Sequence, residues 1–440
     1  QTRLGKAGLN FGANTPCQVR PASPYARFQP ALTNLIQCRC ARIAQLVEHT
    51  IENRGVGSSN NTELGDPAAA THLNGVYVPR PGGFGSAFFD IERVEVNFGP
   101  QGTIRGRQAM AGSVDVIPFK PGLGITESMI EATIGGDGYS EVQGVVNAPV
   151  TDNSAVRLAF FKNERDSLYK NLSPLPSTID ASLDDSRRSD ELAEALDSQA
   201  ARLSYYIEPT SKLDVSLVYD FIEDTGSGYT GTNFIHPFAH GQTAASISDG
   251  RKVVNSFGRA PQQDLEHWGA KLEVNYEAPF ADVQFIASRR ELENNFAATV
   301  PMTPYFDGVL DTIGVNATTG AQDTPRIEVY DNNSFFDMSS ESDSTIGELR
   351  FISNDASKPY NWTTGLFYFQ EEQRTFLGAV SDRNASWETY NNQMSEFNMF
   401  TEAESYSAYA DGTYELGERS RVSAGVRFTD EEKERYGVNV

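Results

Sequence analysis

From about residue 126 onward, apolar and polar residues alternate with the period of two that is typical of β-strands. In the segment KLDVSLVYDF, the apolar face holds Leu213, Val215, Leu217, Tyr219 and Phe221, and the polar face holds Asp214, Ser216 and Asp220. The same division sets Leu272, Val274 and Tyr276 against Lys271, Glu273 and Asn275, and Val422, Ala424, Val426 and Phe428 against Arg421, Ser423 and Arg427. Each strand is therefore expected to separate lipid from water.

The pattern predicts eleven strands, near residues 126–134, 139–148, 154–164, 198–208, 211–223, 264–278, 282–292, 343–353, 361–373, 403–415 and 420–430. The connections between them alternate in length: the long ones cover residues 165–197, 224–262, 293–342 and 374–402. Outer-membrane barrels have tight turns at one rim and long loops at the other, whereas a compact soluble domain rarely carries loops beyond about 15 residues. We therefore expect an all-β membrane protein; a soluble β-rich binding protein is the alternative.

The number of strands bears on closure of the barrel. An odd number of strands cannot close as a bacterial single-chain barrel, and an open sheet leaves strand edges unsatisfied in lipid. The last residues, KERYGVNV, are predicted to form a loop. We expect residues 122–440 to hold an incomplete antiparallel barrel of about 11 strands and the sequence to be a fragment.

The first 60 residues differ from the rest. They contain Cys17, Cys38 and Cys40, which are all the cysteines of the chain, and they show no signal peptide. Cys38 and Cys40 lack the spacing of a zinc site. Residues 41–60, ARIAQLVEHTIENRGVGSSN, resemble the translation of a bacterial transfer-RNA gene. We therefore predict that residues 1–60 are disordered or artefactual.

Charge and motifs exclude several classes of function. The formal net charge of −23 argues against a nucleic-acid partner, because phosphate neutralisation needs clustered lysine and arginine. No apolar run reaches the roughly 20 residues of a membrane helix. The sequence has neither a Gly-x-Ser-x-Gly elbow nor a His-Glu-x-x-His motif. We expect no enzyme, no catalytic residues, no cofactor and no resident metal.

A glycine-rich region precedes the strands. It consists of GDPAAATHLNGVYVPR, residues 65–80, and FFDIERVEVNFGPQGTIRGRQAMAGSVDVIPFKP, residues 88–121, and it matches no phosphate-binding or dinucleotide-binding loop. It resembles the end of the plug domain of TonB-dependent receptors, the energised transporters of the Gram-negative outer membrane. GELRFIS, YNWTTGLFYFQEEQ, SYSAYADGTYEL and RVSAGVRFTDEEKE resemble barrel strands of the same family. Arg105 and Asp115 depart from the usual Tyr and Asn, which puts plug-to-barrel contacts at these two positions in doubt.

The resemblance implies a fold and a function. Residues 61–121 would be the C-terminal part of a small mixed α/β plug domain. Residues 122–440 would be the incomplete antiparallel outer-membrane β-barrel that follows it, with about 11 of the 22 strands of a plugged transporter. The protein would lie in the outer membrane, contact its lipid, and take up a scarce solute such as a ferric siderophore. Its partners would be TonB and the inner-membrane energising complex, although a TonB box is not recognisable. A passive porin-like channel is the alternative, and the plug motif argues against it.

The same resemblance supplies candidate site residues. The plug motif, with structural or gating roles, comprises Arg93, Glu95, Gly99, Pro100, Gln101, Gly102, Gly106, Arg107 and Gly112. Arg107 is expected to point toward carboxylates of the barrel lumen and to help lock the plug. Candidate ligand-binding residues are Arg80, His236, His240, Trp387 and Tyr390, with solvated or interfacial side chains as the alternative.

Overall fold

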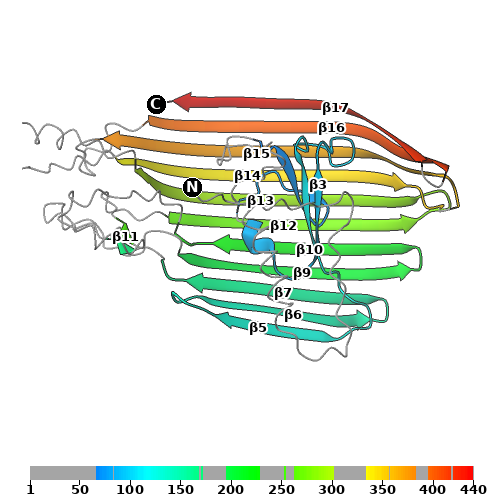
Figure 1. Ribbon diagram of the computed structural model, residues 1–440, viewed down its shortest axis with the longest axis horizontal. Helices are drawn as coiled ribbons and strands as arrows, with labels where there is room; N and C mark the ends of the chain where they lie inside the picture. Colours follow the sequence, from blue (N-terminus) through cyan, green and yellow to red (C-terminus); the bar gives the residue numbers. More distant parts are fainter. Residues whose placement is uncertain are drawn as a thin grey trace, which may run out of the picture.

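The computed structural model describes residues 66–82, 84–167, 170–171, 195–227, 252–253, 262–301, 333–355, 357–382, 395–417 and 420–439. The predictions for residues 1–60, and those for His236, His240, Trp387 and Tyr390, lie outside these ranges. The described residues form an 11-stranded sheet, a four-stranded sheet and a two-stranded sheet, as Figure 1 shows. We call the first the wall sheet and the second the small sheet.

The wall sheet is an antiparallel meander in which each strand pairs with its neighbours along the chain. Its strands are β5 (Glu127–Ile134), β6 (Ser140–Thr151), β7 (Ser154–Arg165), β9 (Leu196–Thr210), β10 (Leu213–Asp224), β12 (Gln262–Glu277), β13 (Asp282–Pro301), β14 (Asn333–Ile352), β15 (Tyr360–Asp382), β16 (Ser395–Gly417) and β17 (Ser420–Asn439). The short strands β8 (Lys170–Asn171) and β11 (Lys252–Val253) pair with each other. All eleven strands predicted from the alternation are confirmed.

Strands β13 to β17 extend well beyond their predicted ends, to 20–23 residues each. The prediction of a loop at KERYGVNV is wrong, because β17 continues to Asn439 and pairs with β16 along this stretch. In these upper parts the outer face turns from apolar to charged, as at Glu432 and Glu434 above Phe428 on β17. The two-residue alternation then disappears from the sequence, while the backbone hydrogen bonds continue.

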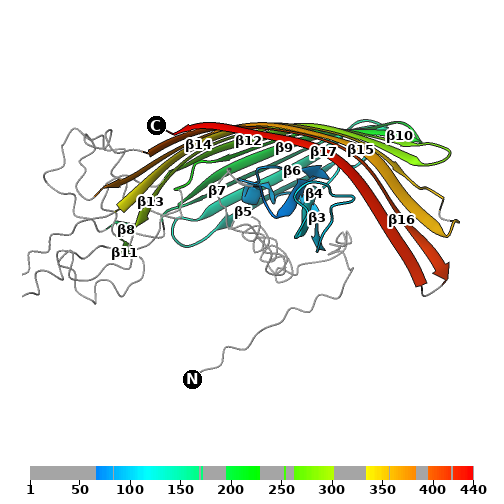
Figure 2. The same ribbon diagram turned by 90° about the horizontal axis from the view of Figure 1, so that it is seen from above.

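The two faces of the wall sheet differ as the alternation predicts. On the outer face, Leu217, Leu366, Val426 and Phe428 are exposed by 52%, 57%, 66% and 75%. On the inner face, residues such as Ser216, Asp220, Lys271 and Glu273 are buried. Buried polar residues need polar partners, and many of them meet the small sheet, which lies on the concave side of the curved wall (Figure 2).

The small sheet has the order β2-β1-β4-β3. Its strands are β1 (Ala69–Leu73), β2 (Val76–Tyr77), β3 (Ile91–Phe98) and β4 (Gly112–Pro118), and a 3-10 helix, η1 (Phe84–Ala87), follows β2. Asn74 and Gly75 join β1 to β2 with φ angles of 54° and 77°. Two-residue hairpin turns favour Asn-Gly because both residues need positive φ.

Apolar clusters hold the small sheet on both of its faces. On one face, Leu73, Val114 and Val116 pack in a cluster with wall residues Val145, Ala159, Ala200 and Ile222. On the other face, the cluster includes Ala70, Val76 and Tyr77 from the small sheet and Ile286, Ile346, Phe367, Phe369 and Ala403 from the wall. Burial of these side chains accounts for the small sheet's position against strands β6 to β16. None of the described residues belongs to a helix long and apolar enough to cross a bilayer.

Candidate functional site: the interface between the small sheet and the wall sheet

One polar link between the segment that follows β2 and the wall sheet joins Arg80 to Glu371 of β15. Arg80 Nε donates to Glu371 Oε1 at 2.7 Å, and Nη2 donates to Oε2 at 3.0 Å. The hydroxyl of Ser342 on β14 also donates to Glu371 Oε1, at 3.0 Å. The exposed fractions are 4% for the Arg80 side chain and 2% for that of Glu371. The prediction of Arg80 in a flexible loop, where solvent or a ligand would meet it, is therefore corrected: the guanidinium is buried in a paired geometry.

Arg107 lies beside β17, the last strand of the wall sheet. Its Nη1 is 3.1 Å from Glu431 Oε1, and its guanidinium carbon lies 4.6 Å from the centre of the Phe369 ring. The structure thus places Arg107 beside a carboxylate of the inner wall, and its role in locking the plug stays a prediction. Two further contacts from β17 reach the small sheet's flanking segments, Lys433 Nζ to Asp66 Oδ2 at 2.8 Å and Arg427 Nη1 to the Thr103 carbonyl at 3.3 Å.

The opposite side of the small sheet is held by β7 and β9. Arg157 of β7 donates two hydrogen bonds to Asp90, Nε to Oδ2 at 2.7 Å and Nη2 to Oδ1 at 2.5 Å. Arg202 of β9 donates to the carbonyls of Phe89 and Ala87 at 3.1 and 3.3 Å. The sequence analysis missed these five residues. The inward parity of the two arginines was readable in their strands, but nothing local connects Asp90 to Arg157.

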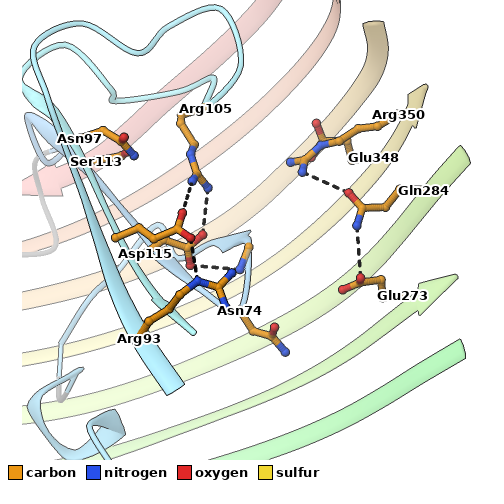
Figure 3. A network of polar contacts seen from close by, with 12 residues as sticks. Asn74, Arg93, Asn97, Arg105, Ser113, Asp115, Glu273, Gln284, Glu348 and Arg350 are labelled. Atoms are coloured by element: carbon orange, nitrogen blue, oxygen red, sulfur yellow. Dashed lines mark hydrogen bonds and ion pairs between the residues drawn. The ribbon is translucent and has the colours of Figure 1, made fainter. Parts of the chain in front are cut away.

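Arg105 and Asp115, the two positions at which the sequence analysis put plug-to-barrel contacts in doubt, form an ion pair with each other. Arg105 Nη1 donates to Asp115 Oδ2 at 2.9 Å, and Nη2 donates to Glu95 Oε2 at 3.3 Å. Glu95 also accepts from Arg93 Nε at 2.9 Å, and Asp115 Oδ1 accepts from the Gly75 amide at 3.1 Å. Figure 3 shows this network on the small sheet. The buried Asp115 carboxylate requires a cation nearby, and Arg105 supplies it.

The ion pair predicts that the effects of substitutions at Arg105 and Asp115 on stability are coupled. Arg105→Tyr alone should destabilise the small sheet by about 1–3 kcal/mol, because it removes the cation that pairs with the buried Asp115 carboxylate. Adding Asp115→Asn should restore about 1–2 kcal/mol of that loss. The measurement is the urea concentration at which trypsin begins to cleave the small sheet of the purified protein. If the losses of stability caused by the two substitutions simply add, Arg105 and Asp115 do not interact energetically.

The remaining motif residues shape the loop between β3 and β4. Gly99, Gly106 and Gly112 have φ angles of 83°, 74° and 146°. The Gln101 amide donates to the Ala109 carbonyl at 2.9 Å, which closes the loop in which Pro100 and Gly102 also lie. A Cβ at position 106 would lie 3.1 Å from Arg427 Nη2, so glycine there lets the loop approach β17. These residues build the interface rather than presenting reactive groups.

A second polar network covers the inner wall near the tight turns. Arg350 donates to Glu348 Oε2 at 2.6 Å and to Gln284 Oε1 at 3.2 Å, and the hydroxyl of Tyr409 donates to Glu348 Oε1 at 2.6 Å. Gln284 Nε2 donates in turn to Glu273 at 3.2 Å. Beside this network, Lys271 Nζ donates to the carbonyl of Asn74 at 2.6 Å.

His72 of β1 lies between the two networks. It is 4% exposed, its ring centre is 5.9 Å from that of Tyr77, and its Nδ1 has no hydrogen-bond partner among the described residues. Burial lowers the pKa of His72 to about 4; Arg105 and Arg350 add to the lowering, and Asp115 and Glu348 oppose it. The imidazole is therefore neutral near pH 7. In the part of the chain that the structure describes, no three His, Cys, Asp or Glu side chains gather as a metal site would require.

No family model matches the chain. Its fold is similar to that of solved outer-membrane receptors at low sequence identity. The ferric yersiniabactin uptake receptor of Yersinia pestis gives a TM-score of 0.64 at 16% identity, over 88% of this chain and 53% of the receptor. The ferripyoverdine receptor of Pseudomonas aeruginosa, bound to ferripyoverdine, gives 0.58 at 10% identity, over 84% and 46%. A copper transporter gives 0.53 at 11% identity, over 84% and 49%.

The chain thus spans about half the length of each of these proteins. The likeness supports the TonB-dependent receptor fold for the described residues, with the 11-stranded antiparallel sheet matching part of a receptor barrel. The similar structures are transport receptors, not enzymes.

Proposed function

We propose that this chain acts in the outer membrane as part of a TonB-dependent receptor that takes up a ferric siderophore or a similar iron chelate. The small sheet, within residues 61–121, is the plug, and residues 122–440 belong to the barrel. The inner-membrane energising complex, acting through TonB, supplies the work that moves the plug. In this account Arg80 and Arg107 lock the plug to the wall, and they do not touch the solute.

One observation carries the proposal. A separate four-stranded sheet lies on the concave side of a curved wall whose convex side is apolar, and buried arginine–carboxylate pairs link the two. A soluble two-sheet protein would bury the apolar faces of its sheets against each other. Here Leu217, Leu366 and Val426 instead face outward, as a lipid-facing wall requires.

The choice of an iron chelate is supported by the similar structures. Those of Yersinia pestis and Pseudomonas aeruginosa are named for ferric yersiniabactin and ferripyoverdine. The copper transporter has a comparable fold, so the fold alone does not select the cargo. Copper is therefore the second candidate that a test has to include.

Uptake and binding tests separate these possibilities. Cells that express the chain should bind radiolabelled ferric chelates saturably in the outer-membrane fraction, and accumulate them only when TonB is present. Equal accumulation with and without TonB would indicate a passive channel. Recovery of the chain in the soluble fraction would indicate a soluble binding protein. Saturable binding of copper without binding of any ferric chelate would overturn the choice of cargo.

A further inference from the structure

Between the Lys271 contact and the Arg80–Glu371 pair, charged groups of the two sheets face each other without bonding across the interface. The small sheet and its β3–β4 loop present Arg93, Arg105 and Asp115, and the wall presents Gln284, Glu348 and Arg350 (Figure 3). Glu95 belongs to the first set, because it accepts hydrogen bonds from Arg93 and Arg105. The hydrogen bonds and ion pairs of the described residues run within each set, and none of them joins one set to the other. We call this strip the seam.

Separating the two sheets at the seam would break no charge-assisted hydrogen bond, whereas separating them elsewhere would. Parting the small sheet from β7 breaks the paired bonds between Arg157 and Asp90, and parting it from β15 breaks those between Arg80 and Glu371. Each is a charge-assisted pair, the stronger kind of hydrogen bond. Parting the seam breaks no such bond, so both of its polar networks stay intact when water enters. The polar contribution to holding the sheets together is therefore smallest here.

His72 is the titratable group enclosed by the seam. Asp115 and Arg105 face it from the small sheet, Glu348 and Arg350 face it from β14, and the Tyr77 ring lies beside it. Both carboxylates already have cations: Asp115 is bonded to Arg105, and Glu348 is bonded to Arg350 and Tyr409. An imidazolium at this position would meet two neutralised pairs, and its Nδ1 hydrogen would have no acceptor among the described residues.

We propose that His72 makes the seam an acid-sensitive joint, at which protonation of the imidazole parts the small sheet from β13 and β14 while the contacts with β7 and β9 hold. The inference rests on the proposed function, because a joint of this kind has a role only in a plug that moves. Acid would then loosen the plug on the β13–β14 side before it releases the arginine locks.

The direction of the pH effect follows from the difference in proton binding between the closed and the open form. In the closed seam His72 has a pKa of about 4, and in contact with water it returns toward 6.5. The open form therefore binds protons more readily than the closed form, and its share rises as the pH falls through this window. Between pH 7.5 and pH 5.0 the open population should increase about 30-fold. At pH 7.5 and above the effect is small, because the imidazole is then largely neutral in both forms.

Adjacent residues of β4 provide a matched pair of reporters. Ser113 is 1% exposed and lies on the same side of the strand as Asp115, whereas Val114 is 5% exposed and packs toward β7 and β9 in the other direction. Ser113→Cys and Val114→Cys are made in the full chain with Cys17, Cys38 and Cys40 replaced by serine. The rate of reaction with a water-soluble maleimide is divided by the rate of the exposed Asn153→Cys at the same pH, which removes the pH dependence of the thiol itself.

The expected result is a rise of about 30-fold in the normalised rate at Ser113→Cys between pH 7.5 and pH 5.0. The rise should disappear when His72→Gln is added, and Val114→Cys should react slowly throughout, which also shows that the fold is intact. A flat profile at Ser113→Cys overturns the proposal, and so does a rise that survives His72→Gln. A parallel rise at Val114→Cys also overturns it, because the whole small sheet then leaves the wall and the contacts with β7 and β9 do not hold. None of these readouts uses a chelate or TonB, so failure of the proposed function would be seen separately in the uptake tests.

Discussion

Replacing Glu371 with alanine is expected to weaken the hold of the wall on the small sheet by about 3–5 kcal/mol, since it leaves the Arg80 guanidinium buried without its carboxylate. The pair is bidentate, and both side chains are almost fully buried. The loss should appear as cleavage of the small sheet by trypsin at much lower urea concentrations, while the wall sheet itself resists. Heat-induced mobility shifts in detergent should report the stability of the wall separately.

The neighbouring glutamate offers a matched control. Glu372 follows Glu371 on β15 but lies on the exposed outer face, so Glu372→Ala should change the stability by no more than about 0.5 kcal/mol. Replacing both partners, Arg80→Met with Glu371→Met, should recover most of the loss, because well-packed apolar residues can substitute for a buried pair. Equal effects of Glu371→Ala and Glu372→Ala would show that the Arg80 pair does not hold the small sheet.

A loss of similar size is expected on the opposite side of the interface. Arg157→Met leaves the Asp90 carboxylate without the two hydrogen bonds that now bind it, and should destabilise the docked small sheet by about 3–5 kcal/mol. The protease assay in urea measures this loss as well. Because Arg157 and Glu371 lie on different strands and share no partner, the two losses should add.

Arg289→Met is the control for this change. Arg289 also lies on a wall strand and also contacts two carboxylates, Glu291 and Asp343, but its side chain is 56% exposed on the outer face. Exposed pairs of this kind contribute about 0–1 kcal/mol. A loss at Arg289→Met as large as that at Arg157→Met would mean that the assay measures the stability of the wall and not the docking of the small sheet.

The wall sheet was predictable because each of its strands repeats the same alternation, with apolar residues outward and polar residues inward. That rule places Leu217 outside and Ser216 inside. It fails at the upper ends of the long strands, where Glu372, Glu402 and Glu432 occupy the outward positions and both faces are polar. The period of two then carries no hydrophobic signal. The sequence analysis ended the predicted strand just after Glu372 and placed Glu402 and Glu432 outside the predicted strands.

For the contacts between the small sheet and the wall sheet, the sequence identified at most one of the two partner residues. The family motif identified Arg107 as a residue that points toward wall carboxylates, but Glu431 could not be chosen among many acidic residues without the register. Arg80 was misread because Pro79 and Pro81 flank it, which is typical of a solvated loop. Asp90 and Arg157 had no sequence signal in common, since only the docking of one sheet in the other brings them together.

Depth-dependent quenching in lipid bilayers tests the central claim most directly. Fluorophores attached at Leu217→Cys and Leu366→Cys on the outer face, and at Ser216→Cys and Ser344→Cys on the inner face, are compared in vesicles with nitroxide-labelled acyl chains. The account predicts strong quenching at the first two positions and little at the last two. Equal quenching on both faces, or stronger quenching at Ser216 and Ser344, would contradict a wall with lipid outside and the small sheet within.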